Sequence, residues 1–301
     1  MNPLNKKSFL FFGGGSGLSN ILKPFVNSFR DDVEYNLSII VSTFDNGGST
    51  GKLRSEKKIP ALGDLRKVIS SLSSESDYIF LEYRFLNKLL SPHTVGNIIL
   101  ENFLNKNKSL IKAIEEMSSI YLQYKATILP ATENYADLVA VVDKKIIFGE
   151  EDIGEYENKT IDDLYFQTID EKKLNTPISN FDVIKKSDYI FFAPGSFYTS
   201  ILASILPHNS IDAIKLSKSK KIMFQNLEER NFIEKLKFFF DKTEGLLPDY
   251  LVSSEKDIEN ELKRIFPSIE FFYHDFTNEK MIVHDYKKTM IFFEKKLGFL
   301  N

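Results

Sequence analysis

Short apolar runs alternate with amphipathic stretches along most of the chain. The runs at residues 9–12, 37–41 and 188–193 are apolar almost throughout, which is typical of strands buried on both faces of a parallel sheet. Residues 18–25 follow the first run with apolar side chains three or four positions apart, the spacing of a helix with one buried face. Strands that alternate with helices predict an α/β fold: a doubly wound, mostly parallel sheet with helices on both faces.

The same alternation continues to the end of the chain. Further strands are expected at 127–130, 138–142, 145–148, 221–225, 250–252, 270–273 and 281–283. Further helices are expected at 63–72, 78–90, 95–104, 231–240, 256–265 and 286–297, and one that starts near Tyr198. Asp143 and Lys144 predict a hairpin turn between 138–142 and 145–148. Residues 44–59 show little regular pattern, so we expect a long ligand-binding loop there.

Domain organisation follows from what the chain lacks. It contains no internal repeat and no convincing linker. We therefore expect residues 1–301 to form a single domain. The polar stretch 149–177 favours a β-rich excursion within 125–177 rather than a separate domain.

Composition narrows the classes of function. The chain has 301 residues, 43% of them apolar, which is enough for a sizeable core. Its net charge of −3 provides no basic field, so no nucleic-acid partner is expected. The absence of cysteine excludes disulfides, thiol catalysis and thiolate metal sites. No apolar run approaches the ~20 residues of a membrane helix, and the first residues lack the apolar core of a signal peptide. We therefore expect a cytoplasmic protein without membrane insertion.

Three glycine-bearing segments each follow a predicted strand: 13–17, 45–51 and 194–196. Ligands of doubly wound sheets bind outside the carboxyl ends of the strands, where these segments gather. Glycine lets the backbone approach a ligand closely, and the free N–H groups of a following helix attract anions. A single segment of this kind is equally consistent with an ordinary tight turn. Their repetition favours a ligand that carries phosphate.

The glycine spacing does not match the familiar nucleotide motifs. The pattern G-x-G-x-x-G fails because Leu18 or Asn20 stands where the third glycine belongs. A P-loop is also absent, since Lys52 is followed by Leu53. Residues 47–51 match the G-x-S-x-G pattern of hydrolases, but Ser49 is not expected at an abrupt strand-to-helix turn. We therefore reject NAD, P-loop and serine-hydrolase assignments.

Two carboxylates are candidates for metal or ligand chemistry. Asp45 follows the strand 37–41 inside a glycine loop, and Asp64 lies at a predicted helix start. Together they can hold one Mg²⁺ whose remaining ligands are phosphate oxygens. The alternatives are a turn cap for Asp45 and a helix N-terminal carboxylate for Asp64. The residues alone leave both interpretations open.

Cations and one histidine lie close to these segments. Lys52, Arg54 and Arg66 resemble a phosphate clamp, because arginine binds two oxygens at once. Solvated surface charge is the alternative, chiefly for Lys52. His93 precedes a predicted helix that carries Asn97 in its first turn, so it is a candidate acid, base or phosphate donor. A structural role for this histidine is the alternative.

Five blocks in order resemble one known family: residues 12–19, 45–54, 63–66, 93–97 and 194–201. It is the family that contains bacterial gluconeogenesis factor, a UDP-sugar-binding regulator, and 2-phospho-L-lactate transferase of coenzyme F420 synthesis. A weaker match is His284-Asp285. The blocks cover nearly the whole chain, and as a set they are far more specific than any one loop.

The resemblance implies a Rossmann-like α/β fold with a nucleotide or nucleotide-sugar in a cleft at the strand carboxyl ends. Its matched blocks supply the expected ligand-binding residues, which are Gly14, Gly15, Ser16, Gly17, Asn46, Gly47, Gly48, Ser49, Lys52, Arg54, Arg66, His93, Asn97, Gly195 and Ser196. In the transferase branch, Asp45 and Asp64 would serve metal and phosphate chemistry.

The chain departs from the family at two places. The family usually has two aspartates where this chain has Asp45 and Asn46, and asparagine is neither a base nor a strong Mg²⁺ ligand. Residues 226–232 also differ from the gluconeogenesis-factor branch. The first hypothesis is a cytoplasmic UDP-sugar-binding protein that regulates carbon metabolism or cell-envelope synthesis. The alternative is a transferase that moves a phospholactyl-type group from a nucleoside diphosphate to an alcohol with Mg²⁺. A partner-only role and a homo-oligomer are left open.

Overall fold

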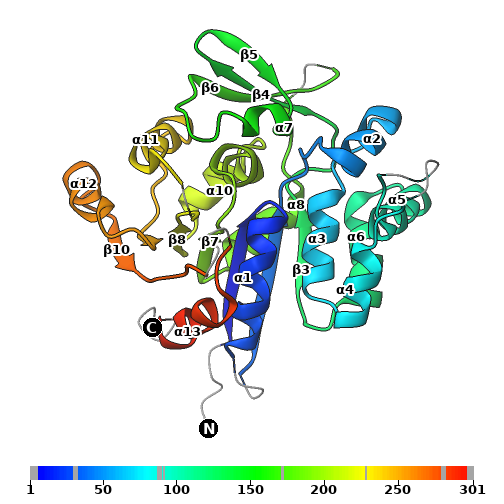
Figure 1. Cartoon of the computed structure of the whole chain (residues 1–301), viewed down its shortest axis with the longest axis horizontal. Coiled ribbons are helices and arrows are strands. Elements are labelled where there is room, and N and C mark those ends of the chain that lie inside the picture. The colour runs from blue at the N-terminus through cyan, green and yellow to red at the C-terminus, as the bar shows by residue number, and fades with distance from the viewer. Residues whose placement is uncertain are drawn as a thin grey trace.

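A seven-stranded parallel sheet forms the centre of the molecule, seen in a computed structural model that describes residues 6–29, 33–86, 90, 92–170, 173–227, 229–278 and 283–296 (Figure 1). Its strand order is β10-β9-β8-β7-β1-β2-β3. The strands are β1 (Lys7–Gly13), β2 (Tyr35–Val41), β3 (Thr127–Pro130), β7 (Tyr189–Phe192), β8 (Lys220–Phe224), β9 (Tyr250–Ser253) and β10 (Glu270–Tyr273). All six neighbouring pairs are parallel, which confirms the predicted α/β class.

Helices cover both faces of this sheet. They are α1 (Ser16–Asn27), α2 (Gly48–Lys57), α3 (Gly63–Ser71), α4 (Glu75–Glu82), α5 (Val95–Asn107), α6 (Leu110–Tyr121), α7 (Glu150–Gly154), α8 (Ile178–Lys186), the π-helix η1 (Phe197–Leu202), α9 (Ala203–Ile205), α10 (Ser210–Leu216), α11 (Phe232–Lys242), α12 (Ile258–Ile265) and α13 (Tyr286–Lys296). Within the described residues, no helix is long and apolar enough to cross a membrane.

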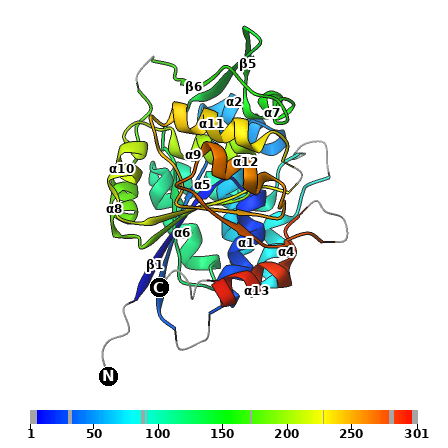
Figure 2. The ribbon, with the colours of Figure 1, turned by 90° about the vertical axis from the view of Figure 1, so that its left-hand side faces the viewer.

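The two faces carry separate cores because successive side chains of a strand point to opposite sides. Phe9 and Phe11 of β1 pack with α1, α3, α6 and α13. Leu10 and Phe12 of the same strand pack with α8, α10, α11 and η1. Figure 2 shows α8 and α10 on one side of the sheet and α1 and α13 on the other. The sheet is therefore buried on both faces, which accounts for its nearly continuous apolar strands.

A second, antiparallel sheet joins the carboxyl edge of the first. Its order is β5-β4-β6, with β4 (Asp137–Val142), β5 (Lys145–Phe148) and β6 (Asp163–Gln167). Asp143 and Lys144 adopt φ values of 49° and 65° in the turn of the predicted hairpin. In both views this sheet lies with α7 and α2 above the strand carboxyl ends (Figures 1 and 2). β3, although inside the range 125–177, belongs to the large sheet.

The prediction of an irregular loop at 44–59 is wrong, because Gly48–Lys57 forms α2. Its helical signal is weak, with two glycines, two serines and a threonine among ten residues. Packing supplies what propensity lacks, since Leu53 and Arg54 are buried. A side chain at Gly51 would lie 1.9 Å from the carbonyl oxygen of Asn46, so the glycine permits this close packing.

The helix predicted at 78–90 is also misplaced. α4 begins after Ser74, whose hydroxyl accepts a hydrogen bond from the Asp77 backbone, and it ends at Glu82. Beyond it the chain pairs with the segment before α5: the Val95 N–H donates to the Tyr83 carbonyl, at 3.0 Å. This tertiary pairing replaces the helix over residues 83–86, and residues 87–89 of the predicted helix lie outside the described residues. Residues 281 and 282 of the predicted strand 281–283, and residue 297 of the predicted last helix, lie outside the described residues.

Candidate functional site

The first and third glycine segments pack directly against one another. A β-carbon at Gly17 would lie 2.0 Å from the carbonyl oxygen of Pro194, and one at Gly14 would lie 2.4 Å from the hydroxyl oxygen of Ser200. Both distances are shorter than any van der Waals contact. These glycines are therefore required by the packing of the two loops as well as by the space they leave for a ligand.

A pocket of about 400 Å³ opens where these loops meet the carboxyl edge of the sheet. Seven predicted site residues line it: Gly15, Ser16, Gly17, Asp45, Asp64, Gly195 and Ser196. Seven further lining residues were not predicted: Asn20, Lys67, Glu150, Ser200, Asn226, Val283 and His284. Gly15 is the N-cap of α1 and has no side chain with which to cap this helix. Its own N–H is hydrogen-bonded to the Asp64 carboxylate, so a carboxylate already lies at the start of α1, and the N–H groups that follow receive no cap from Gly15.

Three carboxylates and one lysine share one end of the pocket. Asp64 lies 3.3 Å from the Lys67 ammonium, and Glu150 accepts a hydrogen bond of 2.9 Å from the Thr199 hydroxyl. Burial raises the pKa of Asp64, and the nearby charge of Asp45 raises it further. Burial, followed by the charges of Asp45 and Asp64, raises the pKa of Glu150 to about 7. Glu150 therefore carries a proton part of the time at neutral pH.

The carboxylates do not form a metal site by themselves. Across the part of the chain that the structure describes, no group of three or more His, Cys, Asp or Glu residues is placed to hold a metal ion. Asp45 and Asp64 are close enough to influence each other's charge, and both line the pocket. Such a pair fits Mg²⁺ that takes its other ligands from phosphate oxygens and water, which is how this ion is usually bound.

A second group of predicted residues lies outside this pocket, in a buried hydrogen-bond chain between α2, α3 and α5. Ser49 lies 3.1 Å from His93 Nδ1 and accepts a hydrogen bond of 2.9 Å from Asn97. Asn97 accepts one of 3.2 Å from Arg66, which also pairs with Glu82. The chain joins three helices, and contact of these residues with a ligand stays a prediction.

Arg54 is buried, and its guanidinium is engaged with the protein itself. It donates to the carbonyl oxygens of Phe44 at 3.3 Å and Ala136 at 2.5 Å, and it lies 4.9 Å from the ring centre of Tyr135. These contacts hold the start of β4 against the loop after β2. Lys52, by contrast, is exposed. Its charge contributes, after burial, to lowering the pKa of His93.

Asn46 positions α7 and thereby Glu150. Its side-chain oxygen accepts a hydrogen bond of 2.8 Å from the Glu151 backbone. A β-carbon at Gly149 would lie 2.2 Å from the Asn46 amide nitrogen, so these two segments touch. Gly47 is the N-cap of α2, and its N–H donates to Asp45 at 2.9 Å. Gly48 has a φ of 45° and a side chain there would meet no atom within 4 Å.

The helix that follows the third glycine segment already binds an anion, namely Glu157. This carboxylate accepts hydrogen bonds of 2.6 Å from the Ser196 hydroxyl and 2.6 Å from the Phe197 N–H. Glu157 also lies 3.2 Å from the ammonium of Lys235, which is fully buried and pairs with Glu229 at 2.8 Å. The N–H group at the start of η1 is therefore engaged by a carboxylate of the protein itself, and ligand binding at the start of α1 stays a prediction.

Sequence reasoning did not select His284 as a site residue because its segment contains no glycine turn. The side chain is 6% exposed, and burial lowers its pKa to about 4. Its Nε2 atom has no hydrogen-bond partner among the described residues. The weak His284-Asp285 match to the family was the one available signal. Lys67 and Glu150 had no signal at all, since neither stands in a recognisable motif.

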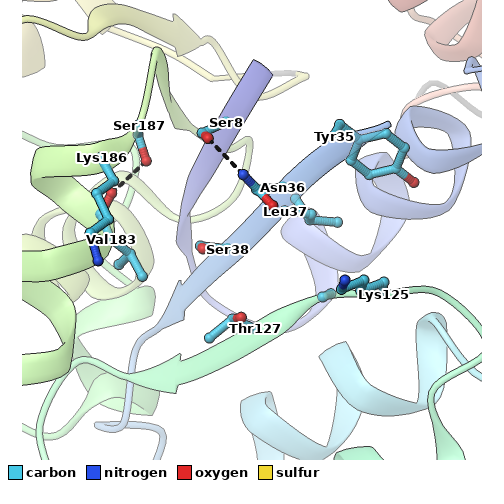
Figure 3. Close-up of a pocket in the computed structure, with 11 residues that line it drawn as sticks. Ser8, Tyr35, Asn36, Leu37, Ser38, Lys125, Thr127, Val183, Lys186 and Ser187 are labelled. Atoms are coloured by element: carbon cyan, nitrogen blue, oxygen red, sulfur yellow. Dashed lines mark hydrogen bonds between the residues drawn. The ribbon is translucent and has the colours of Figure 1, made fainter. Parts of the chain in front are cut away.

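A hollow of similar size lies at the opposite, amino edge of the sheet (Figure 3). It has a volume of about 390 Å³ and lies between the first residues of β2 and β3 and the end of α8. Asn36 donates to the Ser8 hydroxyl there at 3.1 Å. Lys125 and Lys186 are its charged residues. It lacks glycine turns and helix N-termini, so the carboxyl-edge pocket is the candidate functional site.

Comparison with known proteins assigns the chain to a family. The family model of 2-phospho-L-lactate transferase CofD matches residues 10–287. The chain is 33% identical to a gluconeogenesis factor of Halalkalibacterium halodurans over 232 residues, which is 76% of this chain and 69% of that protein. It is 28% identical to the gluconeogenesis factor of Listeria innocua, with 94% of each chain covered.

A solved structure supports the same assignment. The crystal structure of a UPF0052 family member from Bacillus halodurans superimposes with a TM-score of 0.84 at 26% identity, and the match covers 97% of this chain and 99% of that one. The predicted family is thereby confirmed: the chain belongs to the CofD family and is similar over most of its length to bacterial gluconeogenesis factors.

Proposed function

We propose that this protein binds a UDP-sugar-like nucleotide in the carboxyl-edge pocket and acts as a cytoplasmic regulator of carbon metabolism or cell-envelope synthesis. The observation that carries the proposal is the start of α1 inside a pocket of about 400 Å³, where the N-cap residue Gly15 provides no side-chain cap. Free helix N–H groups beside a glycine turn suit a phosphate group. The volume lies within the range of small-molecule sites, about 300–1,000 Å³. The regulatory part of the proposal rests on the gluconeogenesis factors to which the chain is similar.

The test uses an aspartate placed where the phosphate is expected. Ser16 is exposed at the first position of α1, so Ser16→Asp does not disturb the core. Its carboxylate stabilises the helix start yet repels an incoming phosphate. We expect titration calorimetry with UDP-N-acetylglucosamine to show binding that weakens by roughly tenfold or more in this variant, with an unchanged or higher melting temperature. Ser179→Asp, at the second position of α8 and away from the pocket, is the matched control.

Two results would overturn this function. One is the absence of heat with UDP-N-acetylglucosamine, UDP and the other common nucleoside diphosphates. The other is equal affinity in Ser16→Asp and the unaltered protein.

A second candidate is the transferase, which the convergence of Asp45 and Asp64 in one pocket favours. The substrates would be a phospholactyl-type nucleoside diphosphate donor and an alcohol acceptor. Mg²⁺ at the two carboxylates would neutralise charge on the phosphates. The alcohol oxygen would form a bond to the phosphorus of the phospholactyl group while the bond from that phosphorus to the bridging oxygen of the diphosphate breaks, so that the nucleoside monophosphate leaves and the hydroxyl proton passes to solvent. Turnover that requires Mg²⁺ and disappears in Asp64→Asn would support it. Product formation that is unchanged in Asp64→Asn would exclude this role of the carboxylates.

A further inference from the structure

The pocket-lining groups follow a fixed order along the carboxyl edge of the sheet. Asn226 follows β8, Gly195 follows β7, Gly15 follows β1 and Asp45 follows β2. These four strands are consecutive neighbours in the sheet. Neighbouring strands are about 4.8 Å apart, so the first and last positions are separated by roughly 14 Å. The pocket is thus elongated along the carboxyl edge of the sheet, and the two glycine turns lie at its middle.

The two ends of this row differ in charge. Asp45 follows β2 and is close enough to raise the pKa of Asp64 and of Glu150, so the end of the pocket towards β2 is rich in carboxylates. Asp64 also reaches the Gly15 N–H, and Glu150 accepts a hydrogen bond from Thr199 in η1. Phosphate groups avoid such an end unless a cation intervenes, because like charges repel. Carboxylates readily accept hydrogen bonds from the hydroxyl groups of a sugar.

The end at β8 contains no charged side chain among its lining residues. Asn20 comes from α1, Asn226 follows β8, and Val283 and His284 precede α13. His284 is neutral near pH 7 because burial lowers its pKa to about 4. Two amides, a neutral imidazole and one apolar side chain provide donors, acceptors and an apolar contact without net charge. A nucleobase is a ligand group with the same character.

His284 gives a second, independent indication that a ligand binds at this end of the pocket. Its side chain is 94% removed from solvent, and Nε2 makes no hydrogen bond to any described residue. A buried polar atom without a partner destabilises the fold, and each such atom in a native protein calls for an explanation. A ligand atom that completes the hydrogen bond would remove the penalty.

We propose that the end of the pocket formed by Asn20, Asn226 and His284 binds the nucleobase, and that the carboxylate end binds the sugar. The diphosphate then lies between them, at the N-terminus of α1. This assignment rests on the proposed nucleotide binding and adds the direction in which the ligand lies. It makes His284 a residue that selects the base, and Glu150 a residue that contacts the sugar.

The experiment compares two ligands that share a base and differ in the sugar. Affinities for UDP and UDP-N-acetylglucosamine are measured by calorimetry in the unaltered protein and in His284→Leu. Loss of one hydrogen bond is expected to weaken both ligands by roughly fivefold to tenfold, so the ratio of the two affinities stays constant. The preference for UDP over ADP falls at the same time. Glu150→Gln is expected to change the ratio of the affinities for UDP and UDP-N-acetylglucosamine, because in the proposed orientation Glu150 contacts the sugar, which UDP lacks.

Stability separates this role from a structural one. Replacing a buried, unpaired polar atom with an apolar side chain is neutral or stabilising, so His284→Leu should melt no earlier than the unaltered protein. His284→Gln, which keeps a donor and an acceptor, should recover part of the affinity. His208→Leu, at an exposed site outside the pocket, is the control.

Three outcomes distinguish the base assignment, the orientation of the ligand and the proposed function from one another. Nucleotide binding that is identical in His284→Leu and the unaltered protein overturns the base assignment while the proposed function stands. If His284→Leu changes only the ratio of the affinities for UDP and UDP-N-acetylglucosamine, the proposed orientation of the ligand in the pocket is wrong. Failure of the unaltered protein to bind any nucleoside diphosphate overturns both.

Discussion

Replacing Glu150 by glutamine should make the protein more stable at alkaline pH and leave it unchanged at acidic pH. Burial and two neighbouring carboxylates raise the pKa of Glu150 from 4.5 to about 7 in the folded state. Below pH 4.5 the group is protonated whether the chain is folded or not, so it contributes no pH dependence. As the pH rises towards 7, the unfolded chain releases its proton first, and the folded state is progressively penalised.

The magnitude follows from the size of the rise. One pKa unit corresponds to about 1.4 kcal/mol, so a carboxyl whose pKa rises from 4.5 to about 7 destabilises the folded state by roughly 3 kcal/mol above pH 7. Glutamine cannot ionise, and its amide oxygen can still accept the hydrogen bond from Thr199. The difference in unfolding free energy between Glu150→Gln and the unaltered protein should therefore grow by up to this amount from pH 5 to pH 8.

Urea unfolding in EDTA at several pH values measures this difference. Buried Glu229, whose pKa is also raised to about 7 by burial, is present in both proteins and cancels in the comparison. Glu151→Gln, at the adjacent exposed position, is the control and should show no such growth. Parallel stability curves for Glu150→Gln and the unaltered protein would refute the idea that the three carboxylates share one poorly solvated pocket.

Three further substitutions test the packing around the site. Gly17→Ala should prevent stable folding, because the new methyl group would lie 2.0 Å from a backbone carbonyl oxygen; recovery of soluble protein and its circular dichroism spectrum check this. Lys235→Met should destabilise by about 3–5 kcal/mol in urea unfolding, because it leaves buried Glu229 without its cation; adding Glu229→Gln should restore part of the loss. Arg54→Ala should lose about 3 kcal/mol by the same measurement, because buried carbonyl groups lose a charged donor, whereas exposed Lys52→Ala should change little.

The strands of the large sheet could be predicted from the sequence because they are buried on both faces. Residues 127–130 were predicted with the bounds that β3 has, and the hairpin at 138–148 was predicted as well. Strongly apolar runs and turn residues carry this information locally. α2 could not be found in the same way, since its residues favour a helix only when Leu53 and Arg54 are buried against the rest of the chain.

The pocket was only partly predictable for a related reason. Its glycine loops are local motifs, so residues such as Gly15 and Asp64 could be singled out from the sequence, and both line the pocket. Glu150 and His284 come from segments that reach the pocket through tertiary packing, one from α7 and the other from the segment before α13. The sequence of each segment resembles ordinary surface. Arg54 shows the converse, because a cation beside a glycine loop proved to hold backbone carbonyl groups of its own chain.

The ion-paired group of Glu157, Glu229 and Lys235 links three segments that are distant in the sequence. One residue belongs to the excursion that carries the small sheet, one follows β8, and one lies on α11. If the segment that carries the small sheet is replaced by that of a relative, the new segment must supply an acidic residue that pairs with Lys235, or the lysine must be replaced as well. The small sheet is therefore not an independent module. Any chimera built from it must therefore preserve the ion pair with Lys235 on α11.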